Sequence, residues 1–155
     1  MNKANPNERL KHILNILTDE LAKVSKEQND YFRKFPADTK LGINADSAEL
    51  KKITTAYYLH TARISASISK METALSALPT IIVQADSERN RNLIVSCDDL
   101  LTRFSELKKG VLLFAQKSET IITKKQTSSP ELFRYLSELS YKVSYFDKYL
   151  KNISL

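Results

Sequence analysis

Apolar residues recur along most of this chain at alternating intervals of four and three positions. Such a series averages 3.5 residues and puts its members on one stripe of an α-helix, as in coiled coils and helical bundles. The first stripe, interrupted only by a glutamine, comprises Leu10, Leu14, Leu17, Leu21, Val24, Gln28 and Tyr31. Three further stripes run from Leu50 to Leu78, from Leu93 to Ile121 and from Leu132 to Ile153. The four stripes predict four amphipathic helices.

Residues that favour helix ends indicate where these helices begin and stop. Asn5 followed by Pro6, and Ser129 followed by Pro130, are typical of helix starts. Asparagine and serine cap the first N–H groups of a helix, and proline suits its first position. Combined with the stripes, these signals predict helices over about 6–32, 47–78, 87–124 and 130–153.

The segment between the second and third predicted helices allows two interpretations. Pro79 bounds the second helix, and Ile81-Ile82-Val83 either begin the next helix or cover the end of the bundle. The polar residues that follow break the apolar stripe, which favours a loop over 80–86. The third helix would then begin after a cap at Asp86 or Ser87.

The scarcity of turn residues supports an all-α fold. The 155-residue chain contains two glycines and four prolines, too few for the tight turns that an all-β or α/β fold of this size needs. Four helices joined by three loops predict an up-down-up-down four-helix bundle with coiled-coil-like packing. A chain of this length fits one domain, so we assign residues 1–155 to a single helical-bundle domain.

The net charge of +6, from 24 Lys and Arg against 18 Asp and Glu, raises the question of nucleic-acid binding. The basic excess is mild in every part of the chain, and no stripe or tail concentrates it. Binding along a phosphate backbone requires concentrated positive charge. The charge distribution therefore argues against nucleic acid as a partner.

No segment has the apolar length that a signal peptide or a membrane span requires. The longest apolar runs include Ile81-Ile82-Val83 and the five residues from Val111 to Ala115. The single cysteine excludes a disulfide framework and is compatible with a reducing compartment. We therefore expect an intracellular, cytoplasmic protein without a membrane span.

No arrangement of residues predicts catalysis, a metal site or a cofactor. Two His and one Cys are too few for a zinc centre of Cys and His ligands. Di-iron bundles need Glu-x-x-His motifs, and neither His12 nor His60 has a glutamate at that spacing. Cys97 lies on an apolar stripe, where an inert buried thiol is expected. We predict no catalytic residue, no metal, no cofactor and no small-molecule substrate.

The segment around His60 provides one alternative. His60 is followed by Arg63 and by the small residues Ser65-Ala66-Ser67, and in this it resembles histidine phosphotransfer domains, which are also four-helix bundles. The sequence departs from that family at Ile64, where the family has glycine. The resemblance implies a signalling protein that relays a phosphoryl group through His60. The apolar stripe, however, places His60 toward the core.

Several large apolar and aromatic residues lie off the stripes. Leu112 and Leu113 belong to the third predicted helix, and Tyr141, Tyr145 and Tyr149 recur at intervals of four on the last. Tyrosine is favoured at interfaces because it buries a large ring and keeps a polar tip. We predict these five as partner-binding residues, against the alternative that they are ordinary exposed side chains.

Together these patterns favour a non-enzymatic helical interaction module. Such a protein would be an adaptor, a chaperone or a subunit of a multiprotein assembly, and it would bind another protein through helix–helix contacts. The phosphotransfer relay through His60 is the alternative hypothesis, and it requires an exposed imidazole.

Overall fold

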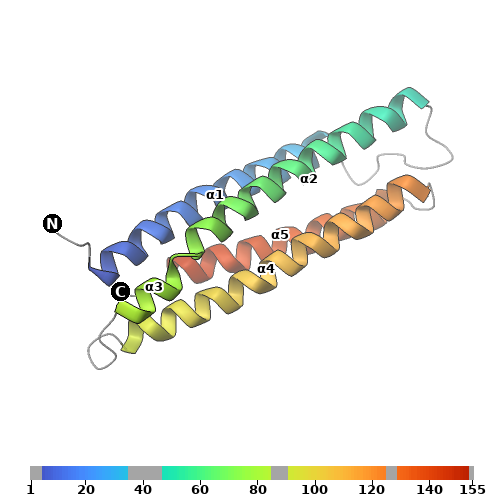
Figure 1. The fold of residues 1–155 in the computed structure, drawn as a ribbon. Coiled ribbons are helices and arrows are strands. Elements are labelled where there is room, and N and C mark those ends of the chain that lie inside the picture. The colour runs from blue at the N-terminus through green and yellow to red at the C-terminus, as the bar shows by residue number, and fades with distance from the viewer. Residues whose placement is uncertain (1–4, 35–46, 85–90, 125–128, 154–155) are drawn as a thin grey trace.

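The computed structural model describes residues 5–34, 47–84, 91–124 and 129–153. Within these ranges the chain forms helices and no strand. The helices are α1 (Pro6–Lys34), α2 (Ser47–Leu75), α3 (Leu78–Gln84), α4 (Arg91–Lys124) and α5 (Ser129–Lys151). The four long helices alternate in direction and pack against one another (Figure 1). The predicted all-α, up-down-up-down four-helix bundle is confirmed.

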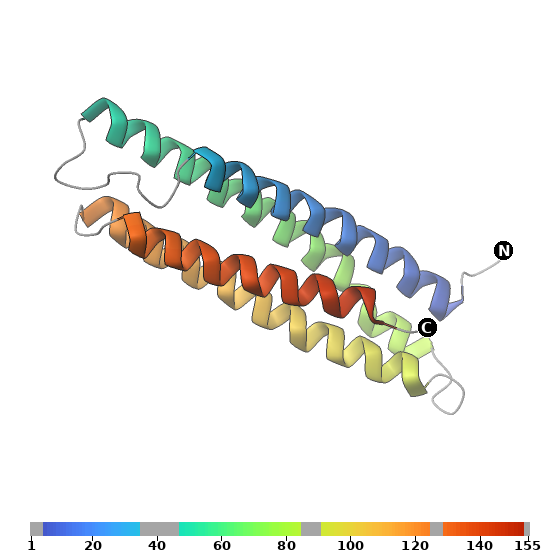
Figure 2. The ribbon, with the colours of Figure 1, turned by 180° about the vertical axis from the view of Figure 1, so that it is seen from behind.

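Two antiparallel hairpins make up the bundle. α1 packs along α2, and α4 packs along α5, as Figure 2 shows from behind. α5 also contacts α1, and α4 contacts α2, so all four long helices surround the core. The start of α1, the end of α5 and the short α3 lie at the same end of the bundle (Figure 1).

The predicted stripes supply the core, because they give each helix one continuous apolar face. In α1, Ile13 is buried in the core although it lies off the stripe, while the stripe residue Leu14 is only partly buried. The buried stripe residues of α4 and α5 are Leu93, Cys97, Leu100, Phe104, Leu107, Val111, Phe114, Ser118, Leu136, Leu139, Val143, Phe146 and Leu150. The stripe side chains of Leu50, Ile53, Ile121 and Leu132 lie outside what the structure describes.

The prediction of one continuous helix over 47–78 is wrong. α2 ends at Leu75, and the chain turns at Ser76 before α3 begins at Leu78. The reason is Pro79, which lacks an N–H and whose ring collides with the carbonyl four positions earlier in a continuous helix. That carbonyl belongs to Leu75. The apolar stripe continues across the break, since Leu78 is buried, so periodicity alone conceals it.

The predicted loop over 80–86 is also wrong for its described part. Residues up to Gln84 belong to α3, where Pro79 occupies the second position and needs no partner for an N–H. The Ile81 N–H donates to the Ala77 carbonyl at 3.2 Å, and the Ile81 side chain is buried. α3 thereby packs against both α1 and α4.

The other predicted boundaries agree with the structure to within a few residues where they are described. Asn5 caps α1, since its Oδ1 accepts a hydrogen bond from the Glu8 N–H at 2.9 Å. The last helix begins at Ser129, one residue before the predicted start. The predicted start of the third helix at 87, with its cap, lies outside the described residues.

Candidate functional site

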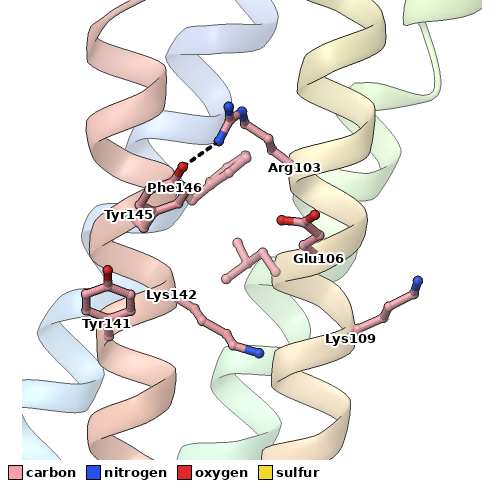
Figure 3. Close-up of a pocket in the computed structure, with 8 residues that line it drawn as sticks. Arg103, Glu106, Lys109, Tyr141, Lys142, Tyr145 and Phe146 are labelled. Carbon is pink, nitrogen blue, oxygen red and sulfur yellow. Dashed lines mark hydrogen bonds between the residues drawn. The ribbon is translucent and has the colours of Figure 1, made fainter.

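A groove lies between α4 and α5 on the outside of their hairpin (Figure 3). Its volume is about 290 Å³. Small-molecule sites enclose roughly 300–1,000 Å³, so the groove is of a size to receive a side chain from a partner. The residues that line it are Arg103, Glu106, Leu107 and Lys109 of α4 and Tyr141, Lys142, Tyr145 and Phe146 of α5.

The floor of the groove is apolar because it belongs to the core stripes. Leu107 and Phe146 are both buried. The Phe146 ring packs against Phe104, with centroids 6.4 Å apart, and against Tyr149 at 6.2 Å. Close-packed interiors hold such rings in fixed positions. The floor is therefore set by the packing of the bundle.

One end of the groove is bounded by a contact that crosses from α4 to α5. Arg103 Nη1 donates a hydrogen bond to Tyr145 Oη at 3.0 Å, the dashed line in Figure 3. The Arg103 guanidinium lies 4.5 Å from the ring centroid of Tyr149, in cation–π geometry, and its Nε is 3.6 Å from Asp99 Oδ2. Burial, followed by the charge of Asp99, raises the pKa of Tyr149 to about 12. The ring under the guanidinium is thus neutral at physiological pH.

A second side chain crosses between the helices at the other end. Lys142 extends from α5 toward α4 (Figure 3). There it lies against Gly110. A Cβ atom on Gly110 would stand 2.8 Å from Lys142 Cδ and 3.3 Å from Lys142 Nζ. A side chain at position 110 is incompatible with this path of the lysine. One of the two glycines in the chain therefore makes room for Lys142.

Positive charge predominates around the groove. Its lining holds three cations, Arg103, Lys109 and Lys142, and one carboxylate, Glu106. Arg103 has Asp99 as an ion-pair partner. Neither lysine has one among the residues that the structure describes. Both ammonium groups are therefore available to another molecule, that of Lys142 reaching across the groove and that of Lys109 pointing outward from α4 (Figure 3).

Two of the five predicted partner-binding residues border this groove. Tyr141 is 72% exposed and Tyr145 is 52% exposed, and both line it. Tyr149 is partly buried at the edge of the core and does not line the groove. Leu112 and Leu113 are exposed, as their off-stripe positions predict, but they are not part of the lining.

The two leucines lie on opposite sides of the outer face of α4. Leu113 follows Lys109 by four positions and so shares its side of the helix, next to the groove. Leu112 follows Lys108 by four positions, and the Lys108 ammonium pairs with Glu72 of α2. Leu112 therefore lies on the side of α4 that faces the other hairpin, away from the two tyrosines.

The two residues that cross the groove, Arg103 and Lys142, were not predicted from the sequence. Neither residue type is unusual on a helix surface, and no spacing distinguishes them. The available signal was Gly110, which costs about 1 kcal/mol in a helix interior and therefore indicates that something packs closely against it. Nothing in the pattern showed that the neighbour is a lysine of α5.

His60 is buried, as its place on the apolar stripe predicts. It is 3% exposed, its ring stacks on Tyr31 with centroids 4.7 Å apart, and Phe114 meets it edge-on at 6.4 Å. Burial, followed by the charge of Arg63, lowers the pKa of His60 to about 4, so the imidazole is neutral at physiological pH. Phosphotransfer requires a partner to reach an imidazole nitrogen, and the ring is enclosed here.

A second hollow, of about 390 Å³, lies beside His60 between α1 and α2. Two ion pairs hold the charges at its rim. Arg63 Nη1 is 3.3 Å from Glu27 Oε2, and Arg33 Nη2 is 2.7 Å from Asp30 Oδ1. These four charges are satisfied within the chain, so they offer an incoming ligand little electrostatic attraction.

Metal and thiol chemistry have no visible basis in the described ranges. No group of three or more His, Cys, Asp or Glu side chains within them is placed to hold a metal ion. Cys97 is fully buried, and burial, followed by the charge of Asp98, raises the pKa of its thiol. None of the described helices combines the length and apolar character needed to cross a bilayer.

Comparison with protein-family models, with curated proteins and with solved structures finds no match to this chain. The α4–α5 groove combines exposed aromatic rings, an apolar floor and two lysines without an ion-pair partner among the described residues.

Proposed function

We propose that this protein is a non-enzymatic helical interaction module, either an adaptor, a chaperone or a subunit of a multiprotein assembly. It binds another protein through helix–helix contacts made by α4 and α5. The observation that supports this is the groove, where Tyr141 and Tyr145 present exposed rings beside the floor of Leu107 and Phe146. Aromatic residues around an apolar pocket dominate the binding energy of many protein interfaces.

The side chains of Tyr141 and Tyr145 differ in how strongly they are restrained before a partner binds. The hydrogen bond from Arg103 holds the Tyr145 hydroxyl, so this side chain loses little rotational freedom when a partner covers it. Tyr141 is the more exposed of the two. We therefore expect Tyr145 to contribute more to binding than Tyr141.

The alternative of a phosphotransfer relay through His60 has no comparable support. Its imidazole is enclosed by Tyr31 and Phe114. Ile64, which stands where phosphotransfer domains have glycine, is buried as well. A hollow borders His60, but the side chain is only 3% exposed, which leaves a receiver domain little access to its nitrogens.

Capture experiments with matched tyrosine variants test the proposal. Wild-type protein, Tyr145→Ala and Tyr58→Ala serve as bait in extracts of the native host, and co-purifying chains are quantified by mass spectrometry. Tyr58 is the control because it is similarly exposed, 47% against 52%, but lies on α2 in the other hairpin. Loss of an interface anchor costs about 2 kcal/mol or more. We expect Tyr145→Ala to weaken capture of a specific partner at least about tenfold.

The control variant should capture that partner as the wild type does. Equal recovery with all three baits, or equal loss with both variants, would show that the groove is not the binding surface. Circular dichroism and thermal unfolding of each variant establish that the comparison is made between folded proteins.

A further inference from the structure

The groove also indicates the chemistry of its partner, an inference that rests on the proposed function. We infer that the groove binds an acidic amphipathic helix of another protein. One large apolar side chain of that helix sits on the floor formed by Leu107 and Phe146. Carboxylates on the flanking turns of the same helix face Lys109 and Lys142.

The shape of the groove limits what enters it. The Arg103–Tyr145 hydrogen bond bounds one end, and Lys142, which crosses toward α4, bounds the other (Figure 3). Lys142 meets α4 at Gly110. Arg103 and Gly110 are seven residues apart on α4, which corresponds to about 10 Å along the axis. A groove of this length and about 290 Å³ accommodates one leucine or phenylalanine side chain between the two crossings.

The charges around that floor select the flanking residues of the partner. Covering an ammonium group without pairing it costs free energy, because the charge loses its hydration. Lys109 and Lys142 have no carboxylate partner among the described residues, and Glu106 is the single acidic group in the lining. A partner with carboxylates near the lysines compensates the free energy lost when the ammonium groups are covered, whereas a basic partner is repelled.

The geometry favours a helix over a nucleic acid. Tyr141 and Tyr145 stand one turn apart on the rim, and the groove runs between two antiparallel helices. This is the arrangement into which a third helix packs, with one side chain in the groove and its neighbours at i+3 or i+4 on the same face. A phosphate backbone needs a longer track of cations than the three found here, one of which is already paired with Asp99.

Designed peptides test this inference on the full chain. Three fluorescein-labelled amphipathic peptides of about 20 residues, long enough to form helix, share one leucine stripe. Their flanking positions carry glutamate, glutamine or lysine. Fluorescence anisotropy at low and high salt measures their affinities. We expect the glutamate peptide to bind at least about tenfold more tightly than the lysine peptide, with a smaller difference in high salt.

Charge-reversed variants locate the effect. Lys109→Glu combined with Lys142→Glu should reverse the order, so that the lysine peptide binds more tightly than the glutamate peptide. Lys51→Glu combined with Lys52→Glu changes the net charge equally at two exposed positions of α2. That control should keep the preference for glutamate.

The other outcomes separate this inference from the proposed function. Equal affinity for all three peptides, or no binding of any peptide to the wild type, overturns the acidic-helix inference, while the capture experiment still decides the interaction role. A single-stranded oligonucleotide that binds more tightly than the glutamate peptide and displaces it also overturns the inference. Reversal by the α2 control variant would show that net charge, and not the groove, sets the order.

Discussion

Each hairpin of the bundle carries a surface hollow, and the two hollows differ in how their charges are satisfied. Between α1 and α2, the carboxylates of Glu27 and Asp30 pair with arginines of the same chain. Between α4 and α5, the described residues provide no carboxylate partner for Lys109 or Lys142. Charges paired within the chain stabilise the local fold, whereas unpaired charges beside apolar surface are available to a partner.

The floors of the two hollows differ as well. The α1–α2 hollow is floored by His60 stacked on Tyr31, while the α4–α5 groove is floored by Leu107 and Phe146. Both hollows arise where two antiparallel helices meet, so their position in the fold does not distinguish them. The residues at the rim and the floor make the difference.

The largest expected effect concerns the buried imidazole of the α1–α2 hollow. The pKa of His60 is about 4 in the folded protein and about 6.5 in an unfolded chain. Between these values the unfolded chain binds a proton that the folded protein excludes, so stability decreases as the pH falls from about 7 to about 4. The full difference corresponds to about 3 kcal/mol. Urea denaturation across this pH range measures it.

Two substitutions separate His60 from other titrating groups. His60→Phe keeps an aromatic ring against Tyr31 and removes the proton site, so it should abolish most of the decrease. His12→Gln changes a surface histidine and should leave the decrease intact. If His60→Phe unfolds with the same pH dependence as the wild type, the enclosed imidazole is not its source.

A smaller effect is expected at the groove from Gly110→Ala. Alanine is favoured over glycine in a helix interior by about 1 kcal/mol, and the flexible end of Lys142 moves aside at little cost. We therefore expect the free energy of unfolding to rise by up to about 1 kcal/mol, while binding of the glutamate peptide weakens because the Lys142 ammonium is displaced. Urea denaturation and peptide titration measure the two changes.

Ser105→Ala is the matched control on the exposed face of α4. It also improves helix propensity, by about 0.5 kcal/mol, but it does not touch Lys142. Peptide affinity should therefore stay at the wild-type value. A marked loss of stability in Gly110→Ala would mean instead that Lys142 is held rigidly against α4.

The smallest expected effect concerns the ion pair between Arg63 and Glu27. Both side chains are partly exposed, so a double-mutant cycle with alanine should give a coupling energy of about 0.2–1 kcal/mol. Lys109→Ala, by contrast, should leave stability unchanged, since no described carboxylate pairs with it. A coupling energy of zero would mean that the charges of the α1–α2 hollow are no better paired than the lysines of the α4–α5 groove.

The apolar stripes predicted the bundle because side-chain periodicity reports directly on which face of a helix is buried. They correctly placed His60 and Cys97 inside and Tyr141 and Tyr145 outside. They failed at Pro79, because the stripe continues through a break that depends on the missing N–H and the shape of the proline ring.

The groove was only partly predictable for a different reason. Tyr145 was identified as an outward aromatic, but its partner Arg103 is 42 positions away in the chain. Which residues of α4 and α5 stand opposite each other depends on the relative shift of the two helices along their axes. Heptad spacing is the same for every such shift, so the contact between Lys142 and Gly110 was not visible in the pattern either.

The short helix α3 has a consequence for how the molecule opens. It contacts both α1 and α4, and the Arg9 side chain of α1 donates a hydrogen bond to the Gln84 side chain of α3. The neighbouring interior is aliphatic, with Leu10 and Ile81 fully enclosed. The two hairpins are therefore fastened to each other at this end.

At the opposite end the interior includes the polar side chains of Gln28, His60 and Ser118. Polar groups contribute less than aliphatic ones to holding helices together. Fraying of the bundle should therefore start at the polar end and travel toward α3, with amide protons exchanging in that order. A half-opened molecule would remain a clamp joined at α3, its arms being the two hairpins.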